Sequence, residues 1–103
     1  MVQGSRRQHP RAVCAGVAAP PGFTPEKYDE AIRRLDAAGH GAPTGRLDHF
    51  ALEADGKIEV FDIWESQEAL EAWGPQGFVP VLIDLGVELH PPTIHPVRNV
   101  IHG

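Results

Sequence analysis

The sequence predicts an α+β fold built on one antiparallel sheet, and three features indicate it. A run of β-type residues, Lys57–Trp64, passes directly into a helix start that Ser66 can cap. Asp55-Gly56 precedes this run and is a strong hairpin signal, because a type I′ turn needs positive φ at both central positions. The chain has 103 residues, 42% hydrophobic and 22% charged, which favours one globular domain. We expect this domain over residues 11–101, after a flexible tail at residues 1–10.

The first half of the chain predicts a strand followed by a helix. A small apolar run at residues 12–18 lies between Pro10 and Pro20-Pro21-Gly22, as expected of a buried strand. Thr24-Pro25-Glu26 then predicts a helix start, because a hydroxyl caps free amides and proline suits the first helical position. Gly39 is the expected helix end. Apolar residues recur along this helix at helical spacing, namely Tyr28, Ala31, Ile32 and Leu35.

The second half predicts a hairpin, a broken helix and a last strand. Strands are expected at Arg46–Glu53 and Lys57–Trp64. The helix after Ser66 should break at Gly74-Pro75, resume near Pro80 and end at Gly86. A final strand at residues 93–101 contains Pro96, which lacks a ladder donor and therefore belongs at a sheet edge. The order strand, helix, strand, strand, helix, strand is that of a ferredoxin-like split βαβ fold with a four-stranded antiparallel sheet.

The two-residue turn also predicts which side chains share a face of the sheet. It sets His49 opposite Asp62 and Leu47 opposite Trp64. One face then carries Phe50, Leu52, Phe61 and Ile63. The other face carries Leu47, Ala51, Ile58, Val60 and Trp64 together with the His49–Asp62 pair. Both faces are largely apolar and the helices cover only one, so the sequence predicts a homodimer whose sheets pack face to face.

Composition excludes several function classes. A formal net charge of −5 argues against nucleic-acid binding, which needs a concentrated basic surface. No segment approaches the roughly 20 apolar residues that cross a bilayer, so we expect no membrane span. A single cysteine, Cys14, excludes an intramolecular disulfide and favours the cytoplasm. Residues 1–10 contain Arg6 and Arg7 but no apolar run, so no secretion signal is expected there. With Arg11, these residues form a solvated basic segment.

His49 and Asp62 are the candidate catalytic residues. An imidazole titrates near neutrality and moves protons, while a carboxylate holds its tautomer and stabilises the cation. The alternative is structural, because cross-strand His/Asp pairs also satisfy two polar groups buried at an interface. A turn longer by one residue would shift the register and separate the pair.

Four aromatic residues are candidates for lining a ligand pocket, namely Tyr28, Trp64, Trp73 and Phe78. Their positions are equally those of ordinary core residues. Cys14 is read as a small hydrophobe rather than a nucleophile. His90 and His95 match no common zinc spacing, so we expect no metal site.

Phe61–Leu70, with the later Trp73 and Phe78, resembles the dimeric α+β barrel superfamily, especially small antibiotic biosynthesis monooxygenase-like proteins. The resemblance spans most of residues 11–101. It implies that two ferredoxin-like protomers join their sheets into a barrel, each keeping a small pocket between sheet and helices. Members include cofactor-independent oxygenases of polycyclic aromatic substrates, haem-degrading enzymes and isomerases. Haem-degrading members carry an iron-ligating histidine after the helix tryptophan, and Phe78–Ile83 contains none, so no cofactor is expected.

Two functions remain open. The first is a dimeric protein that binds a small apolar or aromatic ligand without catalysis, which the lack of a sharp catalytic motif favours. The alternative is a cofactor-independent monooxygenase-like enzyme acting on an aromatic or polyketide-like substrate beside Trp64 and Tyr28, with His49 and Asp62 handling protons. Fold alone does not decide between them.

Overall fold

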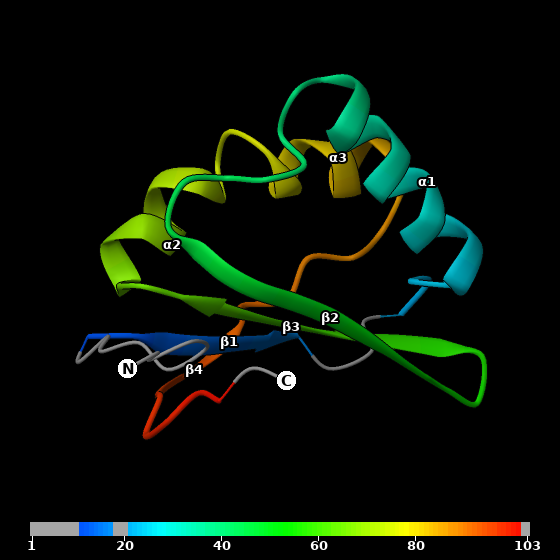
Figure 1. Ribbon diagram of the computed structural model, residues 1–103. Coiled ribbons are helices and arrows are strands. Elements are labelled where there is room, and N and C mark those ends of the chain that lie inside the picture. Colours follow the sequence, from blue (N-terminus) through cyan, green and yellow to red (C-terminus); the bar gives the residue numbers. More distant parts are fainter. Residues whose placement is uncertain (1–10, 18–20, 102–103) are drawn as a thin grey trace.

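A computed structural model describes residues 11–17 and 21–101. The elements are β1 (Val13–Val17), α1 (Pro25–Ala37), β2 (Arg46–Ala54), β3 (Lys57–Trp64), α2 (Gln67–Trp73), α3 (Phe78–Asp84) and β4 (Thr93–Pro96). The strands form an antiparallel sheet in the order β2-β3-β1-β4, with α1, α2 and α3 on one face (Figure 1). The predicted ferredoxin-like α+β fold is confirmed. The predicted tail at residues 1–10 lies outside the described residues.

Helix α1 begins and ends where the sequence predicts. The Thr24 side chain accepts a hydrogen bond from the Lys27 backbone N–H at 3.2 Å, and Gly39 follows the helix with φ of 81°. Ala31 and Leu35 are 0% and 4% exposed, so the predicted apolar stripe faces the sheet. The helix is therefore held by its cap at one end and by burial along its length.

The region of α2 and α3 confirms the predicted break and the restart near Pro80. Helix α2 ends at Trp73, and α3 begins at Phe78, two residues before Pro80. Proline is tolerated there because the backbone N–H groups of the first helical turn have no intrahelical partner. Gly86, with φ of 74°, follows the end of α3.

Strand β4 is shorter than predicted. It ends at Pro96 rather than continuing to Ile101. It pairs with β1 at the edge of the sheet, and one further bond follows, from Val97 N–H to the Ala12 carbonyl at 2.9 Å. Because β1 begins at Val13, residues 98–101 have no β1 residue opposite them and cannot extend the ladder.

The hairpin register is confirmed from Ala54 and Lys57 to the His49–Asp62 pair. Asp55 and Gly56 both have positive φ, at 55° and 74°, as a type I′ turn requires. The predicted pairing of Leu47 with Trp64 is wrong. An irregularity between Arg46 and Asp48 places Arg46 opposite Trp64 and Asp48 opposite Ile63. This bulge adds one residue to β2 and leaves Leu47 out of the ladder.

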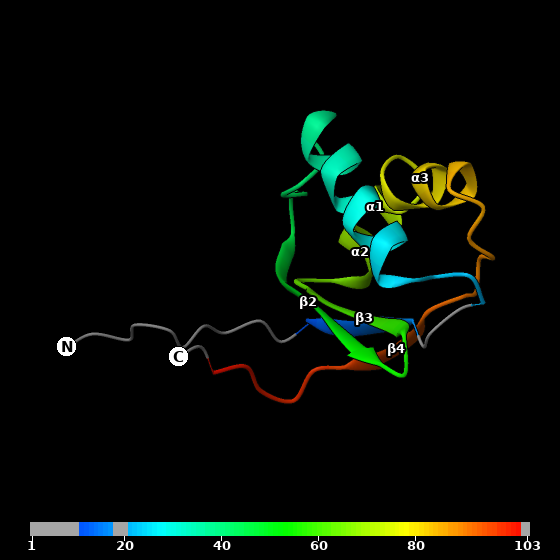
Figure 2. The same ribbon diagram turned by 90° about the vertical axis from the view of Figure 1, so that its right-hand side faces the viewer.

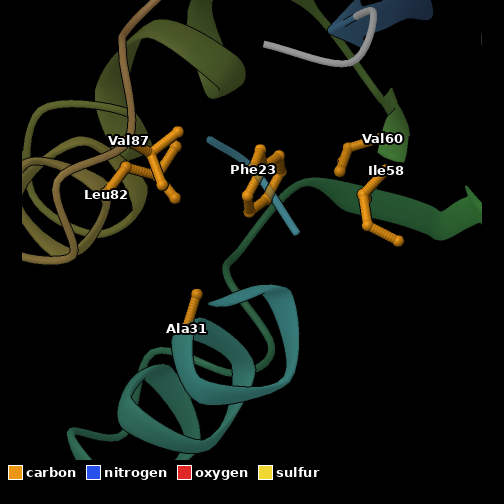
Figure 3. Close-up of a cluster of buried hydrophobic side chains, with 6 residues drawn as sticks. All are labelled: Phe23, Ala31, Ile58, Val60, Leu82 and Val87. Carbon is orange, nitrogen blue, oxygen red and sulfur yellow. The ribbon is translucent and has the colours of Figure 1, made fainter. Parts of the chain in front are cut away.

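The main hydrophobic cluster lies between α1 and the sheet (Figure 3). Phe23, in the loop before α1, is 2% exposed and lies between side chains of the sheet and of the α3 region. The cluster consists of Phe23, Ala31, Ile58, Val60, Leu82 and Val87. It joins the loop, α1, β3 and the α3 region into one packed unit.

The two faces of the sheet differ in exposure. The inner face, beneath the helices, buries Ile58, Val60 and Trp64. The outer face lies on the side away from the helices (Figure 2). There Phe50 and Leu52 are 45% and 49% exposed. The Phe50 and Phe61 rings stack on this face with centroids 5.3 Å apart. The predicted alternation of the central strands is confirmed, and the outer face keeps large apolar side chains in water.

Candidate functional site

His49 and Asp62 form the predicted pair on the inner face of the sheet. His49 Nδ1 lies 2.6 Å from Asp62 Oδ1. Their side chains are 18% and 13% exposed. The pair extends to α1, because Tyr28 Oη lies 2.6 Å from His49 Nε2 and the two rings are parallel within 4°. Three side chains from three elements thus form one polar network, Tyr28–His49–Asp62.

The network has a defined direction when the imidazole is neutral. His49 Nδ1–H donates to the Asp62 carboxylate, so Nε2 is an acceptor and the Tyr28 hydroxyl donates to it. Burial first, and then the negative charge of Asp62, raise the pKa of Tyr28, so its hydroxyl keeps its proton. The network therefore holds one imidazole donor on Asp62 and fixes the orientation of the carboxylate.

A cavity of about 650 Å³ lies between the sheet and the region of α2 and α3. Its floor comes from the strands and includes Ala15, Val60 and Asp62, while α2 and α3 contribute Leu70, Trp73, Phe78 and Val79. The segment Glu88–Pro92, between α3 and β4, lines another side. The walls are mainly apolar, and Asp62 is a carboxylate in the floor.

The structure separates the four predicted aromatic residues into two groups. Trp73 and Phe78 line the cavity, and their rings stack with centroids 5.8 Å apart. Trp64 is fully buried and packs behind Trp73 at 5.4 Å, while Tyr28 belongs to the polar network. Neither Trp64 nor Tyr28 is among the described lining residues. Whether any of the four contacts a ligand remains a prediction.

Asp62, rather than His49, is the member of the pair that lines the cavity. The sequence places the two residues opposite each other but does not show which one reaches the pocket. Three further ionisable lining residues, Glu71, Glu88 and His90, were not predicted as part of a ligand site. Glu71 carried no motif. Glu88 and His90 lie in the chain that descends from α3 to β4 (Figure 1), and that segment lines the cavity.

The remaining candidates lie apart from this cavity floor. His90 pairs with Glu88, with Nε2 and Oε2 2.5 Å apart, whereas His95 lies on β4 opposite Cys14. No group of three or more His, Cys, Asp and Glu residues that could hold a metal occurs within the part of the chain that the structure describes. Burial, and then the charge of Asp62, raise the pKa of the Cys14 thiol, which disfavours the reactive thiolate.

Solved structures resemble this chain in fold. A mutant of SnoaB, a cofactor-independent oxygenase from Streptomyces nogalater, aligns at a TM-score of 0.61 with 18% identity over 86% of this chain and 94% of that one. A conserved protein from Methanosarcina mazei aligns at 0.57, with 14% identity over 89% and 96% of the two chains. A putative antibiotic biosynthesis monooxygenase from Caulobacter crescentus aligns at 0.55, with 19% identity over 86% and 88%.

Neither a protein-family model nor a curated protein matches the sequence. In the described residues, none of the helices has the length and apolar character needed to cross a membrane. The structural alignments confirm at the level of the fold the resemblance that the sequence predicts. This chain has the ferredoxin-like fold of antibiotic biosynthesis monooxygenase-like proteins.

Proposed function

We propose that the protein binds a small, mainly apolar ligand in the cavity beneath α2 and α3, with a hydrogen-bond donor of the ligand directed at Asp62. The observation that carries the proposal is the cavity itself, which has about 650 Å³ of space and a carboxylate in an otherwise mainly apolar floor. Small-molecule sites commonly have roughly this size and composition, with apolar walls and a few placed polar groups.

The walls favour an aromatic or other flat ligand. Trp73 and Phe78 both line the cavity, and a planar molecule beside such aromatic side chains buries apolar area and gains ring–ring contacts. His49 occupies one oxygen of Asp62, and a carboxylate accepts more than one hydrogen bond. A ligand donor at Asp62 would therefore offset the cost of removing water from that carboxylate.

The test uses 1-naphthalenemethanol, a neutral aromatic probe with one donor, and two variants of α3. Val79 lines the cavity, whereas Ile83 on the same helix is 60% exposed. We expect Val79→Trp to fill the cavity and abolish probe binding measured by calorimetry. Ile83→Trp should bind the probe like the wild type. Equal affinity in the two variants would place the binding elsewhere and contradict the proposal.

A second candidate function is oxygenation of a hydroxyaromatic ligand by dioxygen. The feature that favours it is the polar network, because Asp62 lines the cavity with His49 behind it and Tyr28 behind His49. In such an arrangement the Asp62 carboxylate can accept a hydroxyl proton from a bound ligand. The fold likeness to a protein described as a cofactor-independent oxygenase supports the same candidate.

Oxygen uptake with hydroquinone-type substrates separates the two candidates. If the network handles protons in turnover, His49→Ala should reduce the wild-type rate by about 10²-fold or more, the usual weight of a general base. Ligand affinity should change much less, because His49 is not among the described lining residues. Equal rates in wild type and His49→Ala would reject a role of the network in catalysis and leave ligand binding as the function.

We also propose that two copies pair through the outer faces of their sheets. Phe50 and Leu52 expose large apolar side chains there, and a sheet face placed on a two-fold axis covers its own equivalent. Leu52→Lys should convert a dimer to a monomer in sedimentation at micromolar concentration. Glu53→Lys, at a neighbouring exposed position of β2, is the control. A monomeric wild type would contradict the pairing.

The single cysteine, Cys14, favours a cytoplasmic location for this assembly.

A further inference from the structure

The ionisable residues that line the cavity are almost all acidic. Asp62 lies in the floor, and Glu71, Glu88 and His90 line the sides. The described lining residues include no lysine and no arginine. The remaining described lining residues are apolar side chains and a glycine. The charge that a ligand meets is therefore set by these acidic groups and by the histidines paired with them.

The sign of this charge does not depend on the protonation of the histidines. Glu71 accepts a hydrogen bond from Gln67 Nε2 at 3.0 Å, and this neutral partner adds no positive charge beside it. The His49–Asp62 pair carries −1 with a neutral imidazole and 0 with a protonated one. The same holds for the His90–Glu88 pair. With all three carboxylates ionised, the formal charge of these groups lies between −1 and −3 and is never positive.

The surroundings strengthen the effect of that charge on a ligand. Asp62 is 13% exposed and its neighbours in the cavity floor are apolar, so solvent screens its charge less than that of a surface carboxylate. Two aromatic residues, Trp73 and Phe78, line the same cavity, and an aromatic ring attracts a cation placed over its open face. Both features favour a cation with an apolar body and disfavour an anion of the same shape.

We propose that the cavity selects its ligand by charge and takes an aromatic or otherwise apolar amine in its ammonium form. The ammonium donates to the Asp62 carboxylate, and the hydrocarbon body packs against Trp73 and Phe78. An anionic ligand of the same shape, such as a carboxylate or a phosphate ester, is excluded by repulsion from Asp62, Glu71 and Glu88. This inference rests on the proposed function and specifies the chemical class of ligand for the same cavity.

The test compares three probes with one apolar body, namely 1-naphthylmethylamine, 1-naphthalenemethanol and 1-naphthoate. At neutral pH these are a cation, a neutral donor and an anion. Calorimetric titration of the full chain should give the amine a dissociation constant about tenfold or more below that of the alcohol, a difference of about 1.4 kcal/mol. The acid should bind most weakly. The preference for the amine should shrink in 0.5 M NaCl because salt screens charge.

Two variants assign the preference to the cavity. Asp62→Asn keeps the size of the side chain and removes its charge, so the amine should lose its advantage over the alcohol. Glu59→Gln makes the same charge change on β3 outside the cavity, since Glu59 alternates with Ile58 and Val60 and lies on the outer face. Glu59→Gln should leave the order of affinity of the three probes unchanged. If circular dichroism shows Asp62→Asn to be unfolded, the double variant Glu71→Gln, Glu88→Gln replaces it and should reduce the amine preference.

The outcomes separate this inference from the proposed function. Equal binding of all three probes, or tightest binding of the acid, overturns charge selection and leaves a ligand-binding cavity in place. An amine preference that survives in folded Asp62→Asn, or in the Glu71→Gln, Glu88→Gln double variant where that replaces it, also overturns the assignment to these carboxylates. Failure of every probe to bind contradicts the proposed function as well as the charge selection.

Discussion

The layer between the helices and the sheet has a filled half and a hollow half. Beneath α1, Phe23 and Ala31 are 2% and 0% exposed and belong to the main hydrophobic cluster. Beneath α2 and α3, Leu70, Trp73 and Phe78 surround the cavity of about 650 Å³, and α2 contains no fully buried residue. One layer thus supplies stability at one end and space for a ligand at the other.

The difference arises from helix length and from the break after Trp73. Helix α1 has 13 residues and α2 has 7, so α2 brings fewer side chains to the sheet. The chain then passes through Gly74 and Gly77 before α3 begins. A Cβ at Gly77 would lie 2.6 Å from Trp73 Nε1, so this glycine lets the indole lie close to the backbone, where its ring forms part of the cavity wall.

Phe23→Ala should produce the largest loss of stability, because it removes a fully buried ring from the filled half. We expect a loss of about 3–5 kcal/mol in the free energy of unfolding, measured by urea denaturation. Phe78→Ala is the matched change beside the cavity, where the ring is only partly buried against the cluster and borders open space. It should cost clearly less stability and should weaken ligand binding. Equal losses in the two variants would show that the halves do not differ in packing.

Gly77→Ala should have the next largest effect, because the added Cβ displaces the Trp73 indole. Overpacking of this kind costs about 1–3 kcal/mol and should shift the tryptophan fluorescence. Gly74→Ala is the control, since the nearest atom to its added Cβ is the Leu70 carbonyl oxygen at 3.7 Å, an ordinary contact. If Gly77→Ala is as stable as Gly74→Ala, the close approach at Trp73 does not shape the cavity.

Tyr28→Phe should have a moderate effect, because it removes one hydrogen bond at the border between the two halves. The expected loss is about 0.5–1.5 kcal/mol, and the nitrogen resonances of His49 should change because Nε2 loses its donor. Affinity for 1-naphthalenemethanol should stay within about twofold, a difference of only about 0.4 kcal/mol, since Tyr28 is not among the described lining residues. A large loss of affinity would mean that Tyr28 acts on the ligand through His49 and Asp62.

The smallest effect should be the loss of folding stability in acid that Glu30 causes, on the helix α1 that covers the filled half. Hydrogen bonds from Arg33 and Arg34 lower the pKa of Glu30 to about 2, below its value in the unfolded chain. A depressed folded pKa contributes stability above the unfolded value, near 4.5, and this contribution is lost as pH falls toward 2. NMR should show the Glu30 carboxyl titrating near pH 2. Glu30→Gln should make the free energy of unfolding depend less on pH between about 4.5 and 2. Titration of Glu30 near 4.5 would show that the arginines do not hold it.

The fold was predictable from sequence because its signals are local. The Thr24 cap, the Asp55-Gly56 turn and the alternation of β3 each act within a few residues, and all three are confirmed. The errors are of another kind. The bulge that displaces Leu47 depends on contacts between strands, and the early end of β4 depends on where β1 begins. No local pattern records either one.

The candidate site was only partly predictable. The two-residue turn predicted that His49 lies opposite Asp62, because the length of a turn sets the register of the strands it joins. Tyr28 joins that pair from α1, and the distance between a helix and a strand is not encoded in a periodic pattern. Phe23 anchors the core from a loop, outside any amphipathic stripe. Glu71 and Glu88 face the cavity only because α2 and the chain after α3 converge there.

The most direct test of the central claim is an NMR titration of ¹⁵N-labelled protein with 1-naphthalenemethanol, whose neutrality makes the result independent of charge selection. If the hollow half binds the ligand, saturable shifts should appear at the amides of Ala15 and Asp62 and at the Trp73 indole N–H. The amides of Ala31 and Leu35, in the filled half, should stay nearly unchanged. Shifts confined to the outer face around Phe50 and Leu52, or no saturable shifts, would contradict the claim.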